Sequence, residues 1–132
     1  MSKQFAKRKS FYLNAEGSKA LADIGGNMWV NSEKVAPPTQ TEIVRLAIIR
    51  QYKLLEDEEK AKERCRVYKC YKAVPKGNSR ITVVLSSSDI EKMKKIQRFL
   101  TGTKSENTTA SDTITFSLMG AADDPPFGYV VF

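Results

Sequence analysis

The sequence predicts one mainly helical domain with a two-stranded antiparallel β-ribbon, formed by two similar units within a single chain. Three observations favour this fold class. The chain has only 132 residues, apolar residues recur mostly at helical spacing, and the two halves of the chain repeat one pattern. A chain of this length is expected to form one domain, here residues 1–132, or two very small units that share a core.

The first half is expected to begin with a basic arm and a short strand. Residues 1–10 carry four positive charges and no acid, which is typical of a flexible arm. The β-prone segment 10–14 follows, and Asn14 can cap a helix that starts at Ala15. A Gly-Gly pair weakens this helix, and two prolines after it prevent its continuation.

A second helix is expected from Thr39 to about Lys62. Within residues 43–55 the apolar side chains form one stripe at helical spacing, interrupted only by Gln51. Thr39 followed three residues later by Glu42 is a capping box, a pattern that marks the start of a helix.

The second half repeats this order. Residues 80–86 form the clearest strand pattern of the chain, and Ser86 or Ser87 can cap the helix that follows. Gly102 is expected to stop that helix. The last helix is expected from Thr109 to about Ala122, where an Asp-Asp-Pro-Pro sequence ends it.

The repeat can be aligned residue by residue. At an offset of 72 residues, Leu13, Asn14, Leu21, Ile24 and Met28 correspond to Leu85, Ser86, Met93, Ile96 and Leu100. At an offset of 70 residues, Thr39, Thr41, Glu42, Val44 and Ile48 correspond to Thr109, Ser111, Asp112, Ile114 and Leu118. One strand with two helices leaves the strand unpaired and apolar faces exposed, so two copies are expected to form one fold.

The sequence RITVVLSSSDIEKMKKI, followed by a helix with a hydroxyl cap, resembles the ribbon–helix–helix superfamily of MetJ, Arc and CopG-like DNA-binding proteins. TQTEIVRLAIIRQY is similar to that family's second helix. The resemblance implies a single-chain pseudo-dimer, as in some proteins of plasmid-transfer systems and archaeal viruses. Its parts would be a first repeat (8–58), a basic connection (59–79), a second repeat (80–122) and an apolar tail (123–132). Two features depart from the family: Lys9 replaces an apolar residue, and the last helix is rich in Thr and Ser.

The composition favours a nucleic-acid partner, and the alternative is a basic protein without a polyanion partner. Lys and Arg number 22 against 15 Asp and Glu, which gives a net charge of +7. A two-stranded ribbon fits the major groove, and side chains alternate between its faces. Ile81, Val83 and Leu85 are expected to face the core in the second strand, as are Phe11 and Leu13 in the first. The side chains expected to contact bases are Arg80, Thr82, Val84, Arg8, Ser10 and Tyr12. An ordinary solvated sheet face is the alternative for these residues. Because the two outward sets differ, the site on double-stranded DNA is expected to be asymmetric.

The resemblance also implies that the starts of the second helices clamp the DNA backbone, since helix N-termini suit phosphates. The expected phosphate contacts are Thr39, Gln40, Thr41, Thr109, Ala110 and Ser111, with Lys3, Lys7 and Lys9 of the arm. Simple N-capping is the alternative role of the hydroxyl residues. Additional attraction is expected from Arg64, Arg66, Lys69, Lys72 and Lys76. Tyr68 and Tyr71 among them could stack on single strands or pack on the core.

The sequence argues against an enzyme and against a cofactor. It has no histidine, no phosphate-binding GxxxxGK[ST] loop and no GxGxxG. Cys65 and Cys70 are too few to form a zinc site, so no metal is expected. The N-terminus has no apolar signal region and no segment is long enough to span a membrane, so a cytoplasmic protein without membrane contact is expected.

Three functions remain open, ahead of a carboxylate-based enzyme as a distant fourth. The first is a sequence-specific double-stranded DNA-binding protein acting as a transcriptional regulator, often a repressor in this family. The second is the same fold as an accessory factor at a plasmid-transfer (relaxosome) or partition site. The third is a protein-interaction module that uses the apolar tail FGYVVF. In the first two, the protein is expected to be a monomeric pseudo-dimer, able to associate further on DNA.

Overall fold

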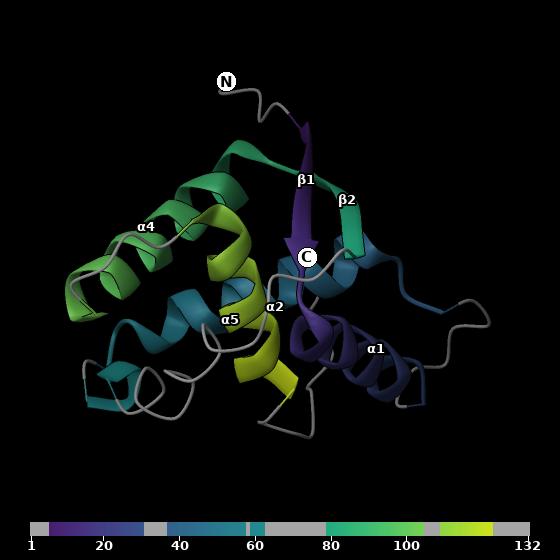
Figure 1. The fold of residues 1–132 in the computed structure, drawn as a ribbon, viewed down its shortest axis with the longest axis horizontal. Coiled ribbons are helices and arrows are strands. Elements are labelled where there is room, and N and C mark those ends of the chain that lie inside the picture. Colours follow the sequence, from purple (N-terminus) through teal and green to yellow (C-terminus); the bar gives the residue numbers. More distant parts are fainter. Residues whose placement is uncertain (1–5, 31–36, 58, 63–78, 105–108, 123–132) are drawn as a thin grey trace.

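The order strand, helix, helix occurs twice along the chain (Figure 1). The computed structural model describes residues 6–30, 37–57, 59–62, 79–104 and 109–122. The elements are β1 (Lys7–Leu13), α1 (Ala15–Val30), α2 (Gln40–Leu54), β2 (Ser79–Leu85), α4 (Ser87–Lys104) and α5 (Ala110–Ala122). The expected class, mainly helical with a two-stranded antiparallel sheet, is confirmed. None of the described helices is long and apolar enough to cross a bilayer.

The two strands pair antiparallel, with Ser10 directly opposite Thr82 at the centre of the ribbon. β1 begins at Lys7, earlier than expected, so Lys7, Arg8 and Lys9 belong to the ribbon and not to an arm. The reason is the length of β2, whose residues up to Leu85 offer backbone partners to this part of β1. These pairings satisfy backbone groups that an extended arm would leave to water.

Both first helices begin at an N-cap in the expected place. Asn14 Oδ1 accepts a hydrogen bond of 2.8 Å from Gly17 N, and Ser86 Oγ accepts one of 3.1 Å from Asp89 N. Gly102, which was expected to end α4, lies inside it, because the helix continues to Lys104. A single glycine costs a helix only about 1 kcal/mol, which the packing of the rest of α4 can offset.

The second helices also begin as expected, but α2 ends earlier than the prediction of about Lys62. It stops at Leu54, and residues 55–57 form a turn. Asp57 then starts a separate helical turn over residues 59–62, since its Oδ1 accepts from Lys60 N and its carbonyl accepts from Ala61 N. The charged segment therefore contains a new N-cap, a role that aspartate favours.

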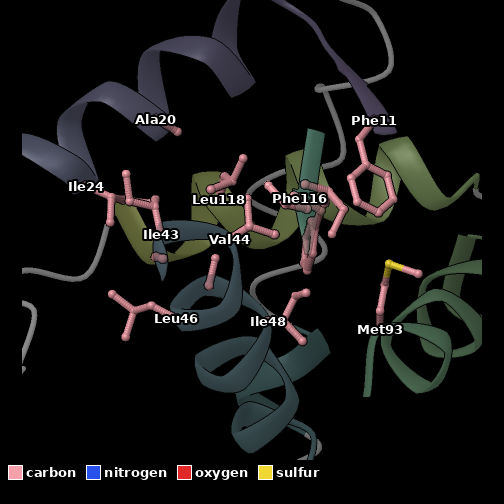
Figure 2. Close-up of a cluster of buried hydrophobic side chains, with 14 of the residues drawn as sticks. Phe11, Ala20, Ile24, Ile43, Val44, Leu46, Ile48, Met93, Phe116 and Leu118 are labelled. Atoms are coloured by element: carbon pink, nitrogen blue, oxygen red, sulfur yellow. The ribbon is translucent and has the colours of Figure 1, made fainter. Parts of the chain in front are cut away.

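Each half packs against elements of the other half around one core. α1 packs against α5, α2 packs against α4 and α5, β1 contacts α5 and β2 contacts α2. Figure 2 shows side chains of both halves meeting in this core, among them Ile24, Val44, Ile48, Met93, Phe116 and Leu118. Burial of this shared apolar surface is the main stabilising contribution to the fold.

The hydroxyl-rich helix α5 is buried along most of its length. Its hydroxyls are compatible with burial because they hydrogen-bond to its own backbone: Thr113 Oγ1 donates to Thr109 O at 2.9 Å, and Ser117 Oγ donates to Thr113 O at 2.8 Å. Such bonds to the carbonyl four residues earlier satisfy the polar atom inside the helix. The polar composition of α5 therefore does not exclude it from the core.

Candidate nucleic-acid interface

One face of the ribbon is buried and the other is exposed. Phe11, Leu13, Ile81, Val83 and Leu85 point into the core, where each is at most 5% exposed. The outward side chains, all exposed, are Arg8, Ser10 and Tyr12 of β1 and Arg80, Thr82 and Val84 of β2. The six residues expected from the sequence to contact bases thus lie together on one solvent-facing surface, which we call the ribbon face.

A short chain of polar groups occupies the centre of the ribbon face. Ser10 Oγ and Thr82 Oγ1 lie 3.1 Å apart, within hydrogen-bond distance. Arg80 Nη2 donates to the same Ser10 Oγ at 3.2 Å. These exposed bonds add little stability, but they orient the Arg80 guanidinium across the surface, where it can meet a ligand.

The ribbon as a whole is electropositive. Lys7, Arg8, Lys9 and Arg80 are exposed, and neither strand contains an acidic residue. Lys9 lies on the side of β1 that Phe11 buries, yet it is exposed. Four cations without a neighbouring strand carboxylate favour a polyanion as the partner.

The N-termini of two helices flank the ribbon, one at each edge. Tyr12 N of β1 donates to Ser111 Oγ of α5 at 3.1 Å, and Val84 N of β2 donates to Thr41 Oγ1 of α2 at 3.1 Å. These bonds satisfy backbone N–H groups at the edge of a two-stranded sheet. The N–H groups at the starts of α2 and α5 therefore lie beside the ribbon face, where an anion on that face could reach them.

The capping residues of these helices use their hydroxyl oxygens locally. Thr39 Oγ1 accepts from Glu42 N at 3.2 Å, and Thr109 Oγ1 accepts from Asp112 N at 3.1 Å. Thr109 N donates in return to Asp112 Oδ2 at 3.2 Å, which completes a capping box. Between the caps and the edge hydroxyls, Gln40 is exposed, whereas Ala110 is half-buried and can offer only its backbone N–H.

Sequence reasoning missed the contacts from Thr41 and Ser111 to the ribbon. Their matched hydroxyls in the aligned repeat were the available signal, but that signal alone could not separate a phosphate contact from a bond to the strand. It also missed an ion pair between the halves. Asp89 Oδ2, which is buried, lies 2.8 Å from Arg45 Nε and also accepts from Ser86 N at 3.0 Å. This pair fastens the start of α4 to α2.

Several predicted sites lie outside the described residues. They are Lys3, the inter-repeat residues Arg64, Cys65, Arg66, Tyr68, Lys69, Cys70, Tyr71, Lys72 and Lys76, and the tail at 123–132. Among the residues that the structure does describe, no three His, Cys, Asp or Glu side chains gather in a way that could hold a metal ion. The ribbon face with its two flanking helix N-termini is the candidate nucleic-acid interface. No family model, curated protein or solved structure matches the chain.

Proposed function

We propose that this chain is a sequence-specific, double-stranded DNA-binding protein of the ribbon–helix–helix type, with both repeats of a pseudo-dimer in one polypeptide. The observation that carries the proposal is the register of the ribbon. Ser10 and Thr82 are equivalent in the repeat, and they lie directly opposite one another. An antiparallel pair of equivalent strands must pair in this way if a two-fold axis relates them.

The edge contacts support the same symmetry. Tyr12 and Val84 are equivalent in the repeat, as are Ser111 and Thr41. Each backbone N–H donates to the hydroxyl of the other half, and both bonds measure 3.1 Å. A strand of one repeat is thus tied to the second helix of the other, which is the exchange expected between two subunits of a dimer.

The helix caps add a further matched pair. Asn14 caps α1 through the N–H of Gly17, and Ser86 caps α4 through the N–H of Asp89. Both pairs of residues correspond at the same offset of 72 as the strands. The packing of α1 on α5 and of α4 on α2 follows the same exchange between halves.

A DNA duplex fits this arrangement. Adjacent strands lie about 4.8 Å apart, so a two-stranded ribbon can enter a major groove about 12 Å wide. The exposed arginines and hydroxyls could then meet base edges, and the N-termini of α2 and α5 would face the phosphates on either side. A regulator of transcription is the role we assign, because occupation of a specific site in the major groove can exclude or recruit other proteins.

The proposal is tested by fluorescence anisotropy with a labelled random-sequence duplex and the matching single strand, at two salt concentrations. Wild type should bind the duplex, and binding should weaken steeply as salt rises. The double substitution Arg80→Ala and Thr82→Ala should reduce duplex affinity by at least about tenfold, since it removes a cation and a hydroxyl from the ribbon face.

A matched control removes the same charge elsewhere. Arg98 is exposed on α4, so Arg98→Ala lowers the net charge by one without altering the ribbon face. This variant should bind nearly as well as wild type. Absence of duplex binding at low salt would refute the proposal and leave a protein partner as the better candidate. Equal losses in the two variants would show attraction by net charge alone.

A further inference from the structure

The outward side chains of the ribbon form three rows, each with one residue from either strand. The rows are Arg8 with Val84, Ser10 with Thr82, and Tyr12 with Arg80. Ser10 and Thr82 are the central row, so the two ends of the ribbon face differ in composition. One end carries an arginine and a valine, and the other end carries an arginine and a tyrosine.

A rotation about the central row compares the two ends directly. It exchanges Arg8 with Arg80, which are chemically identical, and Ser10 with Thr82, which both present a hydroxyl. It also exchanges Tyr12 with Val84, and these two share no chemistry. Tyr12 offers a phenol that donates or accepts a hydrogen bond, whereas Val84 offers only methyl groups.

Both of these side chains are available to a ligand. Tyr12 is 56% exposed and Val84 is 43% exposed, although both are large and partly or wholly apolar. Valine can contact a thymine methyl group in the major groove, whereas a tyrosine hydroxyl can bond to a base donor or acceptor. A base pair that suits one of them will therefore not suit the other.

The two strands also differ at their first residues, but this difference contributes less to the reading of a base sequence. Lys7 of β1 corresponds to Ser79 of β2 in the repeat, so a cation is present in one half only. Both residues lie on the inward side of the alternation, at the start of their strands. A cation in such a place can strengthen phosphate contact, which positions a protein on DNA without reading its sequence.

We infer that Tyr12 and Val84 set the asymmetry of the DNA site, while Arg8 and Arg80 read the same base in both half-sites. This inference rests on the proposed function and specifies it further. The preferred duplex is a near-palindrome. Its two halves match at the positions met by the arginines and differ at the positions met by Tyr12 and Val84.

Three single-chain variants test the inference. Tyr12→Val gives both ends an arginine and a valine, Val84→Tyr gives both an arginine and a tyrosine, and the double exchange reverses the order of the ends. Wild type is first used to select a site from a random-sequence duplex pool. Two palindromes are then built by doubling either half of that site, and affinities are measured at one salt concentration.

Wild type should prefer the selected site over both palindromes by on the order of tenfold, the usual effect of one mismatched base pair. Tyr12→Val should prefer one palindrome and Val84→Tyr the other, each by a similar factor. The double exchange should select the wild-type site again, in the opposite orientation relative to the chain. Because both side chains are exposed, circular dichroism should show native folding in all three variants.

Two results would overturn the inference while leaving DNA binding intact. One is selection of a true palindrome by wild type. The other is an unchanged preference for the asymmetric site in either single variant that folds. One folded single variant is enough for this test. Failure of wild type to bind any duplex would instead refute the proposed function, and the inference with it.

Discussion

At the scale of single residues, Asp89 has the most demanding position in the molecule. Its carboxylate is buried, and one oxygen accepts hydrogen bonds from the Arg45 guanidinium and from the Ser86 backbone. The equivalent position in the other half is Gly17. A Cβ there would lie 3.2 Å from both Thr115 Cγ2 and Thr115 Oγ1. One contact between the halves is therefore an ion pair, and its counterpart is close packing of small groups.

Replacement of Asp89 by alanine should lower the free energy of unfolding by about 2–3 kcal/mol, because it removes a buried, charged acceptor from two part-buried hydrogen bonds. Urea denaturation measures this change. Glu91→Ala is the matched control, since it removes an exposed carboxylate from the same helix and should change stability by less than about 0.5 kcal/mol. Similar values for the two variants would show that the ion pair contributes nothing.

The limits of sequence reasoning are visible at this scale. Alternation along β2 correctly separated inward Ile81, Val83 and Leu85 from outward Arg80, because a strand with one buried face has a period of two. The partnership of Arg45 with Asp89 could not be predicted, because it depends on how α2 of one half packs against α4 of the other. Periodicity in the sequence shows which face of a helix or strand is buried, but not which other element packs against that face.

At the scale of elements, the starts of helices were easier to predict than their ends. Asn14, Thr39 and Thr109 marked three starts, because a cap acts through a local bond to a backbone N–H a few residues on. The predicted end of α2, at about Lys62, was wrong because the charged segment after Leu54 is also compatible with a helix. The turn at residues 55–57, with the cap at Asp57, separates α2 from the helical turn at 59–62. The extent of β1 depended on its partner strand and therefore on tertiary structure.

The Gly-Gly pair in α1 gives a prediction at this scale. A Cβ on Gly26 would meet nothing within 4 Å, so Gly26→Ala should raise the free energy of unfolding by about 0.5–1 kcal/mol through helix propensity. A Cβ on Gly25 would lie 2.9 Å from Cδ1 of Ile43, which is buried. Gly25→Ala should therefore raise the free energy of unfolding by less than Gly26→Ala does, or lower it, because Ile43 must move.

Thermal unfolding of the two alanine variants beside wild type measures the difference. We expect a higher midpoint for Gly26→Ala than for Gly25→Ala. Equal midpoints, or the reverse order, would mean that α1 does not pack against α2 at Ile43 as described, since intrinsic propensity alone favours both substitutions equally.

At the scale of the whole molecule, the two repeats make different contributions to one surface. β1 supplies three of the four cations of the ribbon, at Lys7, Arg8 and Lys9, and β2 supplies Arg80. Each strand is tied at its edge to a helix of the other half. The ribbon face therefore depends on both halves, and separating them would leave neither with a paired strand.

This distribution of charge leads to a prediction about salt. If Lys7 and Lys9 contact phosphates while Arg8 and Arg80 contact bases, the logarithm of the association constant should fall with the logarithm of salt concentration with a slope of about −2. Lys9→Ala should reduce the magnitude of that slope by about 1 and weaken all duplexes alike. Lys94→Ala on the exposed side of α4 is the control, and its slope should equal that of wild type.

The most direct test of the central claim is an NMR titration of the ¹⁵N-labelled chain with a short duplex. If the ribbon enters the groove, the largest changes in amide shifts should map to residues 8–12 and 80–84 and to the starts of α2 and α5. The exposed side of α4 should change little. Shifts concentrated on α4, or no shifts at low salt, would contradict the account, because the ribbon face would then not be the surface that binds DNA.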